Sequence, residues 1–219
     1  MYKHSCCERT AITMGYTLPL EQISLSDYRQ LLRQQNLLPG RRVLQEQLDE
    51  RFALLTSSGI ANLAQLSAAL ATLVKLTSLA VKTGIPEEYL VILRRELGSL
   101  AQKPVPLCDF PGCDEAQIRS LASAGIRNSR DYWEQCLKPG DELSALCELV
   151  RINGVGAVAA HAFYEAGFID VAAVAQANAV DMLSRVNTVN AEKGYYKAKL
   201  GEKDMQFCID YAKLLLLYS

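Results

Sequence analysis

The sequence is poor in histidine, since His4 and His161 are the two histidines among 219 residues. A serine or cysteine nucleophile needs a nearby base, and two histidines leave little to supply one. No phosphate-binding loop of the GxxxxGK type occurs, and no dinucleotide fingerprint follows a strand pattern. Paired carboxylates such as Glu87–Glu88 stand at helix starts, where capping accounts for them. We therefore expect a protein that is not an enzyme and uses no cofactor.

Long apolar runs are missing as well. The longest aliphatic stretch near an end, LLLL at 214–217, is far shorter than the roughly 20 residues that span a bilayer. Residues 1–22 contain no apolar core of signal-peptide length. These absences predict no membrane contact and a cytoplasmic location.

Cysteine is present, but in a pattern that favours reduced thiols over a disulfide framework. The seven cysteines are an odd number at irregular spacing, as expected of reduced thiols. Cys108 and Cys113 enclose four residues, as in a metal knuckle, but no second pair stands at ligand spacing. We expect no metal site.

What the chain does have is helical periodicity. Apolar residues recur at helical spacing in 24–38, 41–58 and 62–83. We expect one helix in 41–58 that ends at Gly59, and two short helices in 62–83 that end at Gly84. The range 85–100 begins with a proline and two glutamates, as helices often do. Sustained two-residue alternation, the pattern of strands, does not occur. The sequence predicts an all-α fold, a compact array of short helices.

Two segments of the chain resemble each other. FPGCDEAQIRSLASAGI (110–126) aligns with INGVGAVAAHAFYEAGF (152–168), 42 residues later. In each, two glycines stand 13 residues apart around a helical stretch. Because one short helix cannot bury its apolar face alone, such units are expected to stack as tandem helix-hairpin-helix-like pairs. We expect an irregular N-terminal segment and two helical units, at 1–23, 24–106 and 107–219.

The second of these segments contains a candidate phosphate site. In hairpins that bind DNA, turn amides at a helix N-terminus meet phosphate oxygens and a nearby cation adds charge. The candidate residues here are Arg151, Asn153, Gly154, Val155, Gly156 and His161. Residues 104–219 hold 11 basic and 15 acidic side chains, against 12 and 9 in residues 1–103, and the helix after the turn adds no lysine or arginine. Glycines that serve tight turns and close packing are the alternative explanation, and the charge favours it.

The hairpin and the spaced series around it resemble known proteins. INGVG followed by AFYEAGF is similar to the helix-hairpin-helix motif, an apolar-Gly-apolar-Gly turn between two helices. The wider series runs from SSGIANLAQL through KTGIPEEYLVILRREL to the closing FCIDYAKLL. Over roughly residues 25–218, in two tandem passes, it resembles the bacterial family called domain of unknown function 4332.

This resemblance implies an all-helical fold related to helix-hairpin-helix and sterile-alpha-motif-like bundles, for which DNA binding is presumed by analogy. The chain departs from the pattern at LKPGDELSALCELV in the second pass, and at Asp114, which stands where the other hairpin has Gly156.

The function expected from these observations is that of a non-catalytic binding or scaffold protein. Its helical faces would contact a protein partner or a second copy of the chain. The alternative is sequence-independent binding of a nucleic-acid backbone at the 151–161 hairpin.

Overall fold

The computed structural model describes residues 15–35, 37, 39–136 and 141–218. Over these residues the chain forms short helices and no strand, apart from two isolated bridges between single residues. The predicted fold class, an all-α array of short helices, is confirmed. The tandem helix-hairpin-helix units stay a prediction.

The helices follow one another with short connections. The α-helices are α1 (Leu25–Gln34), α2 (Leu48–Ser57), α3 (Leu63–Leu70), α4 (Leu73–Thr83), α5 (Glu87–Ser99), α6 (Glu115–Ser123), α7 (Ser129–Cys136), α8 (Glu142–Leu149), α9 (Ala157–Glu165), α10 (Val171–Ala175), α11 (Ala179–Lys193) and α12 (Glu202–Leu217). The 3₁₀-helices are η1 (Pro39–Gln45) and η2 (Leu107–Asp109).

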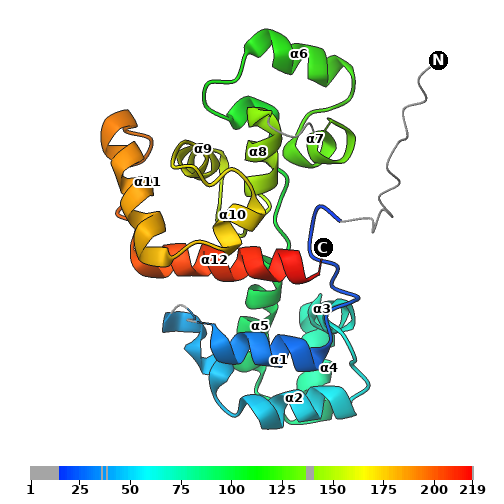
Figure 1. Ribbon diagram of the computed structural model, residues 1–219. Coiled ribbons are helices and arrows are strands. Elements are labelled where there is room, and N and C mark those ends of the chain that lie inside the picture. The colour runs from blue at the N-terminus through cyan, green and yellow to red at the C-terminus, as the bar shows by residue number, and fades with distance from the viewer. Residues whose placement is uncertain (1–14, 36, 38, 137–140, 219) are drawn as a thin grey trace, which may run out of the picture.

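The helices pack in two groups. Helices α1 to α5 contact one another and η1, whereas α7 contacts α8, α8 contacts α9, and both α10 and α11 contact α12. Figure 1 shows α12 crossing the middle of the molecule, between the group formed by α1 to α5 and the group that contains α6 to α11. The Tyr211 hydroxyl of α12 donates to the Leu100 carbonyl at 2.7 Å, which ties α12 to the end of α5. The boundaries expected at 24–106 and 107–219 stay a prediction.

Side-chain caps fix where several helices begin. Ser24 accepts a hydrogen bond from the Asp27 N–H at 3.1 Å before α1, and Thr72 accepts one from the Lys75 N–H at 3.3 Å before α4. The expectation of a single helix over 41–58 is wrong, because Gln47 adopts a left-handed backbone with φ 47° between η1 and α2. Amphipathic spacing continues across this break, so the periodicity alone does not reveal it.

Three helices end in the same type of turn. After α2, α6 and α9, a glycine with positive φ is followed by a buried apolar residue whose N–H bonds back five residues. The angles are 95° at Gly59, 88° at Gly125 and 86° at Gly167. The bonds run from Ile60 to Leu55 at 3.3 Å, from Ile126 to Leu121 at 2.9 Å and from Phe168 to Phe163 at 2.9 Å.

The residue two positions after each of these apolar residues caps the next helix, as its sequence position predicts. Asn62 accepts from the Gln65 N–H at 3.0 Å, Asn128 from the Asp131 N–H at 3.0 Å, and Asp170 from the Ala173 N–H at 2.6 Å. The two asparagines also form the isolated bridges, Asn62 with Ser24 and Asn128 with Pro106. These bridges hold the start of α1 beside α3 and the start of η2 beside α7.

The core is continuous through both groups. Buried apolar side chains form one cluster that includes Leu32 and Leu66 in the first group and Phe163 and Met182 in the second. Of the N-terminal segment expected at 1–23, residues 1–14 lie outside the described residues. Residues 15–23 form no helix, yet the Tyr16 side chain is buried.

Within the described part of the chain, no single helix is both long and apolar enough to cross a membrane. Helices α3 and α4 reach that length and apolarity only as a pair, bent by 110° at the break between them.

Substitution by alanine should have opposite effects on stability at a glycine in a left-handed turn and at a glycine inside a helix. We expect Gly59→Ala to lower the free energy of unfolding by about 1–2 kcal/mol, because a Cβ strains a positive φ even where space is open. Gly98 lies inside α5, also in open space, so Gly98→Ala should raise that free energy by up to about 1 kcal/mol. Urea unfolding followed by circular dichroism measures both, and equal shifts of the same sign would contradict the assignment.

Candidate functional site

The hairpin predicted between α8 and α9 is a tight turn closed by one backbone bond. The Val155 N–H donates to the Ile152 carbonyl at 3.0 Å, and Gly154 has φ 84°. Only glycine adopts this angle without strain, which explains Gly154. The bond also occupies the Val155 amide, one of the donors that the phosphate hypothesis invokes.

Gly156 has a different role. It is the N-cap residue of α9, with an extended backbone at φ −90° that any residue can adopt. In the aligned hairpin, Gly112 has φ 75°, close to the angle at Gly154, and Asp114 takes the place of Gly156 and caps α6 through its side chain. The two hairpins thus share the first glycine's geometry, and the second glycine is dispensable for the turn.

Arg151 faces the interior and not a ligand. It is 2% exposed, and its Nε and Nη2 donate to the carbonyls of Tyr16 and Gly15 at 3.0 and 3.2 Å. Its guanidinium also lies over the Trp133 ring, 4.5 Å from the centroid. Burial lowers the pKa of Arg151, and the nearby Glu148 carboxylate opposes that shift. Through these two hydrogen bonds, Arg151 holds residues 15–16 against the second group of helices.

His161 is also buried, at 8% exposure, and carboxylates surround it. Its Nδ1 lies 3.6 Å from Glu142 Oε1 and its Nε2 lies 3.6 Å from Glu165 Oε1. The Tyr195 ring meets the imidazole edge-on at a centroid distance of 5.2 Å. An anionic phosphate is repelled by such surroundings.

Of the six candidate residues, the structure brings Asn153, Gly154 and Val155 together on the wall of a cavity and leaves Arg151 and His161 in the interior. Gly156 is exposed beside the turn. Nucleic-acid binding at this hairpin stays a prediction. It rests on the turn alone, because the buried Arg151 and His161 place no positive charge at the surface.

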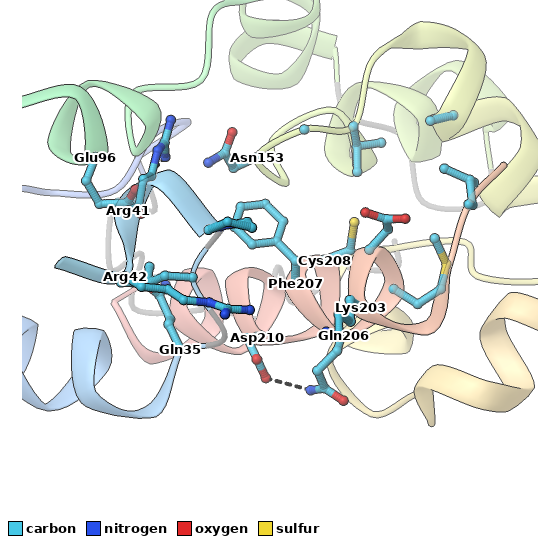
Figure 2. A pocket seen from close by; sticks show the side chains of 18 of the residues that line it. Gln35, Arg41, Arg42, Glu96, Asn153, Lys203, Gln206, Phe207, Cys208 and Asp210 are labelled. Carbon is cyan, nitrogen blue, oxygen red and sulfur yellow. Dashed lines mark hydrogen bonds and ion pairs between the residues drawn. The ribbon is translucent and has the colours of Figure 1, made fainter. Parts of the chain in front are cut away.

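The cavity itself has a volume of about 530 Å³ and lies between the two groups of helices. Its walls come from η1, the end of α5, the hairpin, α9 and the first half of α12. Figure 2 shows Arg41 and Arg42 on one side of it, Asn153 above, and Phe207 and Lys203 along α12. Phe207 packs against the hairpin, because its Cε1 is 3.7 Å from the point where a Cβ on Gly154 would lie.

Sequence reasoning did not connect these residues with the hairpin. Arg41–Arg42 and Lys203 lie far from residue 154 along the chain, and each belongs to a segment that resembles an ordinary solvated surface. The contact depends on how α12 crosses the molecule, for which the sequence carries no local signal.

A second feature is the exposed apolar face of α4. Leu73, Val74 and Val81 are 64%, 80% and 82% exposed, respectively. Lys75 and Lys82 lie on the same helix, and residues 61–86 contain no acidic side chain. We refer to these five residues of α4 as the α4 face.

We next considered metal-binding clusters and reactive thiols in the described parts of the chain. No group of three or more histidine, cysteine or acidic side chains there is placed to hold a metal ion. Cys208 lines the cavity, and burial, followed by the nearby Asp204 carboxylate, raises the pKa of its thiol to about 12. This thiol is protonated at neutral pH and is a poor nucleophile.

Comparison with known proteins gives one match. Residues 137–215 match the family described as Domain of unknown function (DUF4332), whereas the resemblance expected from the sequence spans roughly 25–218. No curated protein and no solved structure matches the chain.

The buried guanidinium gives a stability prediction. Arg151→Met should lower the free energy of unfolding by about 2–4 kcal/mol, because the buried Tyr16 carbonyl and the Gly15 carbonyl lose their donor. Arg95 is exposed on α5, so Arg95→Met should change it by less than about 0.5 kcal/mol. Equal effects of the two substitutions in urea unfolding would rule out the anchoring role of Arg151.

Proposed function

We propose that this protein, whose residues 137–215 belong to the DUF4332 family of unknown function, is a non-catalytic binding protein that contacts another protein through the α4 face. The observation that carries the proposal is the exposure of Leu73, Val74 and Val81 on one helix. Clustered aliphatic side chains with this much exposed surface mark sites of interaction.

The charge of the α4 face indicates the kind of partner. Lys75 forms no side-chain hydrogen bond or ion pair within the described residues, and the Lys82 ammonium donates to the Ser58 carbonyl at 2.8 Å. With no acidic side chain in residues 61–86, both positive charges stay uncompensated in this segment. A complementary partner surface is apolar at its centre and acidic at its rim.

A second copy of the chain offers one such surface. Residues 104–219 carry an acidic excess of four, whereas residues 1–103 carry a basic excess of three. Contact between the basic part of one copy and the acidic part of another is a head-to-tail association. Self-association and capture of a different acidic protein are thus two forms of the same proposal.

A photo-cross-linking residue placed at Val74 or Val81 tests the proposal in the purified protein and in the cells that produce it. We expect cross-linked protein adducts at both positions, with yields that fall as the salt concentration rises. Arg95 is the control position, because it is exposed on α5, in the same basic part of the chain as α4 and outside the α4 face. Equal cross-linking at positions 74, 81 and 95 would overturn the proposal.

A double substitution separates binding from folding. Val74→Ser with Val81→Ser should abolish the adducts formed from a cross-linker at position 73, while the free energy of unfolding changes by less than about 0.5 kcal/mol per site. Two other outcomes count against the protein-binding proposal. One is that the protein cosediments with anionic phospholipid vesicles and the double substitution abolishes this cosedimentation. The other is steeply salt-dependent binding of labelled duplex or single-stranded DNA.

A further inference from the structure

The cavity between the two groups of helices has the dimensions of a ligand site. Its volume of about 530 Å³ falls within the roughly 300–1,000 Å³ typical of small-molecule sites, which often lie between packed units of a protein. We propose that it binds a small amphiphile that has one aliphatic tail and a carboxylate head group.

The walls of the cavity are suited to an aliphatic tail. Phe207 of α12 lines it at 38% exposure, and Ala159 of α9 and Leu200 line it half-buried, so these side chains offer apolar surface to a ligand. Phe207 stands beside Gly154, 3.7 Å from the point where a Cβ on that glycine would lie. Burial of a tail against these side chains is favourable at about 25 cal/mol per Å² of apolar surface removed from water.

The acidic side chains of the wall already have partners. Glu96 pairs with Arg41, which also lies 3.4 Å from the Ser99 hydroxyl. Asp204 accepts the Gly201 N–H at 2.8 Å, and Asp210 accepts the Gln206 amide at 2.8 Å, the bond drawn in Figure 2. Arg41 neutralises the charge of Glu96, whereas the neutral N–H donors hold the Asp204 and Asp210 carboxylates in place without neutralising them.

The remaining charged groups of the wall are cations. Arg42 and Lys203 line the cavity and form no hydrogen bond or ion pair with any residue that the structure describes. The carboxamide of Asn153 stands at the opposite edge, as Figure 2 shows. Unpaired donors beside an apolar wall favour an anionic head group over a neutral or cationic one.

Calorimetric titration with three probes that share one tail tests this choice of head group. Dodecanoate and dodecylammonium are added to the full-length protein below their micellar concentrations, and dodecanol below its solubility limit. We expect dodecanoate to bind most tightly, followed by dodecanol, and the melting temperature to rise with the free concentration of each probe that binds. Equal affinity for all three, or tightest binding of dodecylammonium, would overturn the proposal.

Substitution of the two unpaired cations tests whether they bind the carboxylate head group. Arg42→Gln combined with Lys203→Gln should weaken dodecanoate binding by about tenfold or more and leave dodecanol binding within about twofold. Arg95→Gln, which removes an exposed arginine outside the cavity, should change neither. Unchanged dodecanoate binding in the double variant excludes the proposed head-group site.

A larger side chain on the cavity wall tests whether the aliphatic tail occupies the cavity. Ala159 lines the cavity on α9, so Ala159→Phe should abolish binding of dodecanoate and dodecanol alike. The control is Val158→Phe at the neighbouring residue, which is 38% exposed and outside the cavity wall. Full binding by a folded Ala159→Phe protein contradicts the proposal; if that variant does not fold, the charge variants decide it. Neither result bears on the α4 face, so this proposal and the proposed function fail independently.

Discussion

A buried guanidinium is the interaction on which the arrangement of the second helical group depends. Arg151 lies two residues after the end of α8, where the hairpin that leads to α9 begins, and its side chain binds the carbonyls of Gly15 and Tyr16. The Tyr16 hydroxyl in turn bonds Ser129 at 2.6 Å, at the start of α7. Three separate parts of the chain therefore meet around one positive charge. A buried charge is costly without partners, so this meeting is also specific: the donors leave little freedom for another arrangement.

The burial of Arg151 changes the role that can be assigned to the hairpin side chains. Its arginine, which in the sequence looks like a phosphate contact, holds the N-terminal segment, and its histidine lies between two carboxylates. What remains at the surface is the turn around Gly154, and α12 covers one side of it with Phe207. The hairpin thus serves as part of a wall shared by η1, α9 and α12. Elsewhere on the described surface, the α4 face has the most exposed large apolar side chains, Val74 and Val81.

Local rules account for most of what the sequence predicts correctly. The all-α class follows from apolar spacing, and the helix ends at Gly59, Gly84 and Gly125 follow from the need for a left-handed residue. The break at Gln47 escapes these rules, because glutamine is not a residue type that favours a positive φ. Long-range contacts escape them too. The burial of Arg151 by residues 15–16 and the approach of Arg42 and Lys203 to the hairpin depend on pairs far apart in the chain.

The extended backbone of Gly156 has a consequence for how such hairpins are recognised in other chains. The turn requires one glycine, at 154 or 112, and the position two residues later tolerates a cap such as Asp114. What both segments keep is a nine-residue helix, α6 or α9, framed by left-handed glycines 13 residues apart. A search pattern that scores this interval will therefore detect hairpins that a paired-glycine signature overlooks, including the one at 110–126 in this chain.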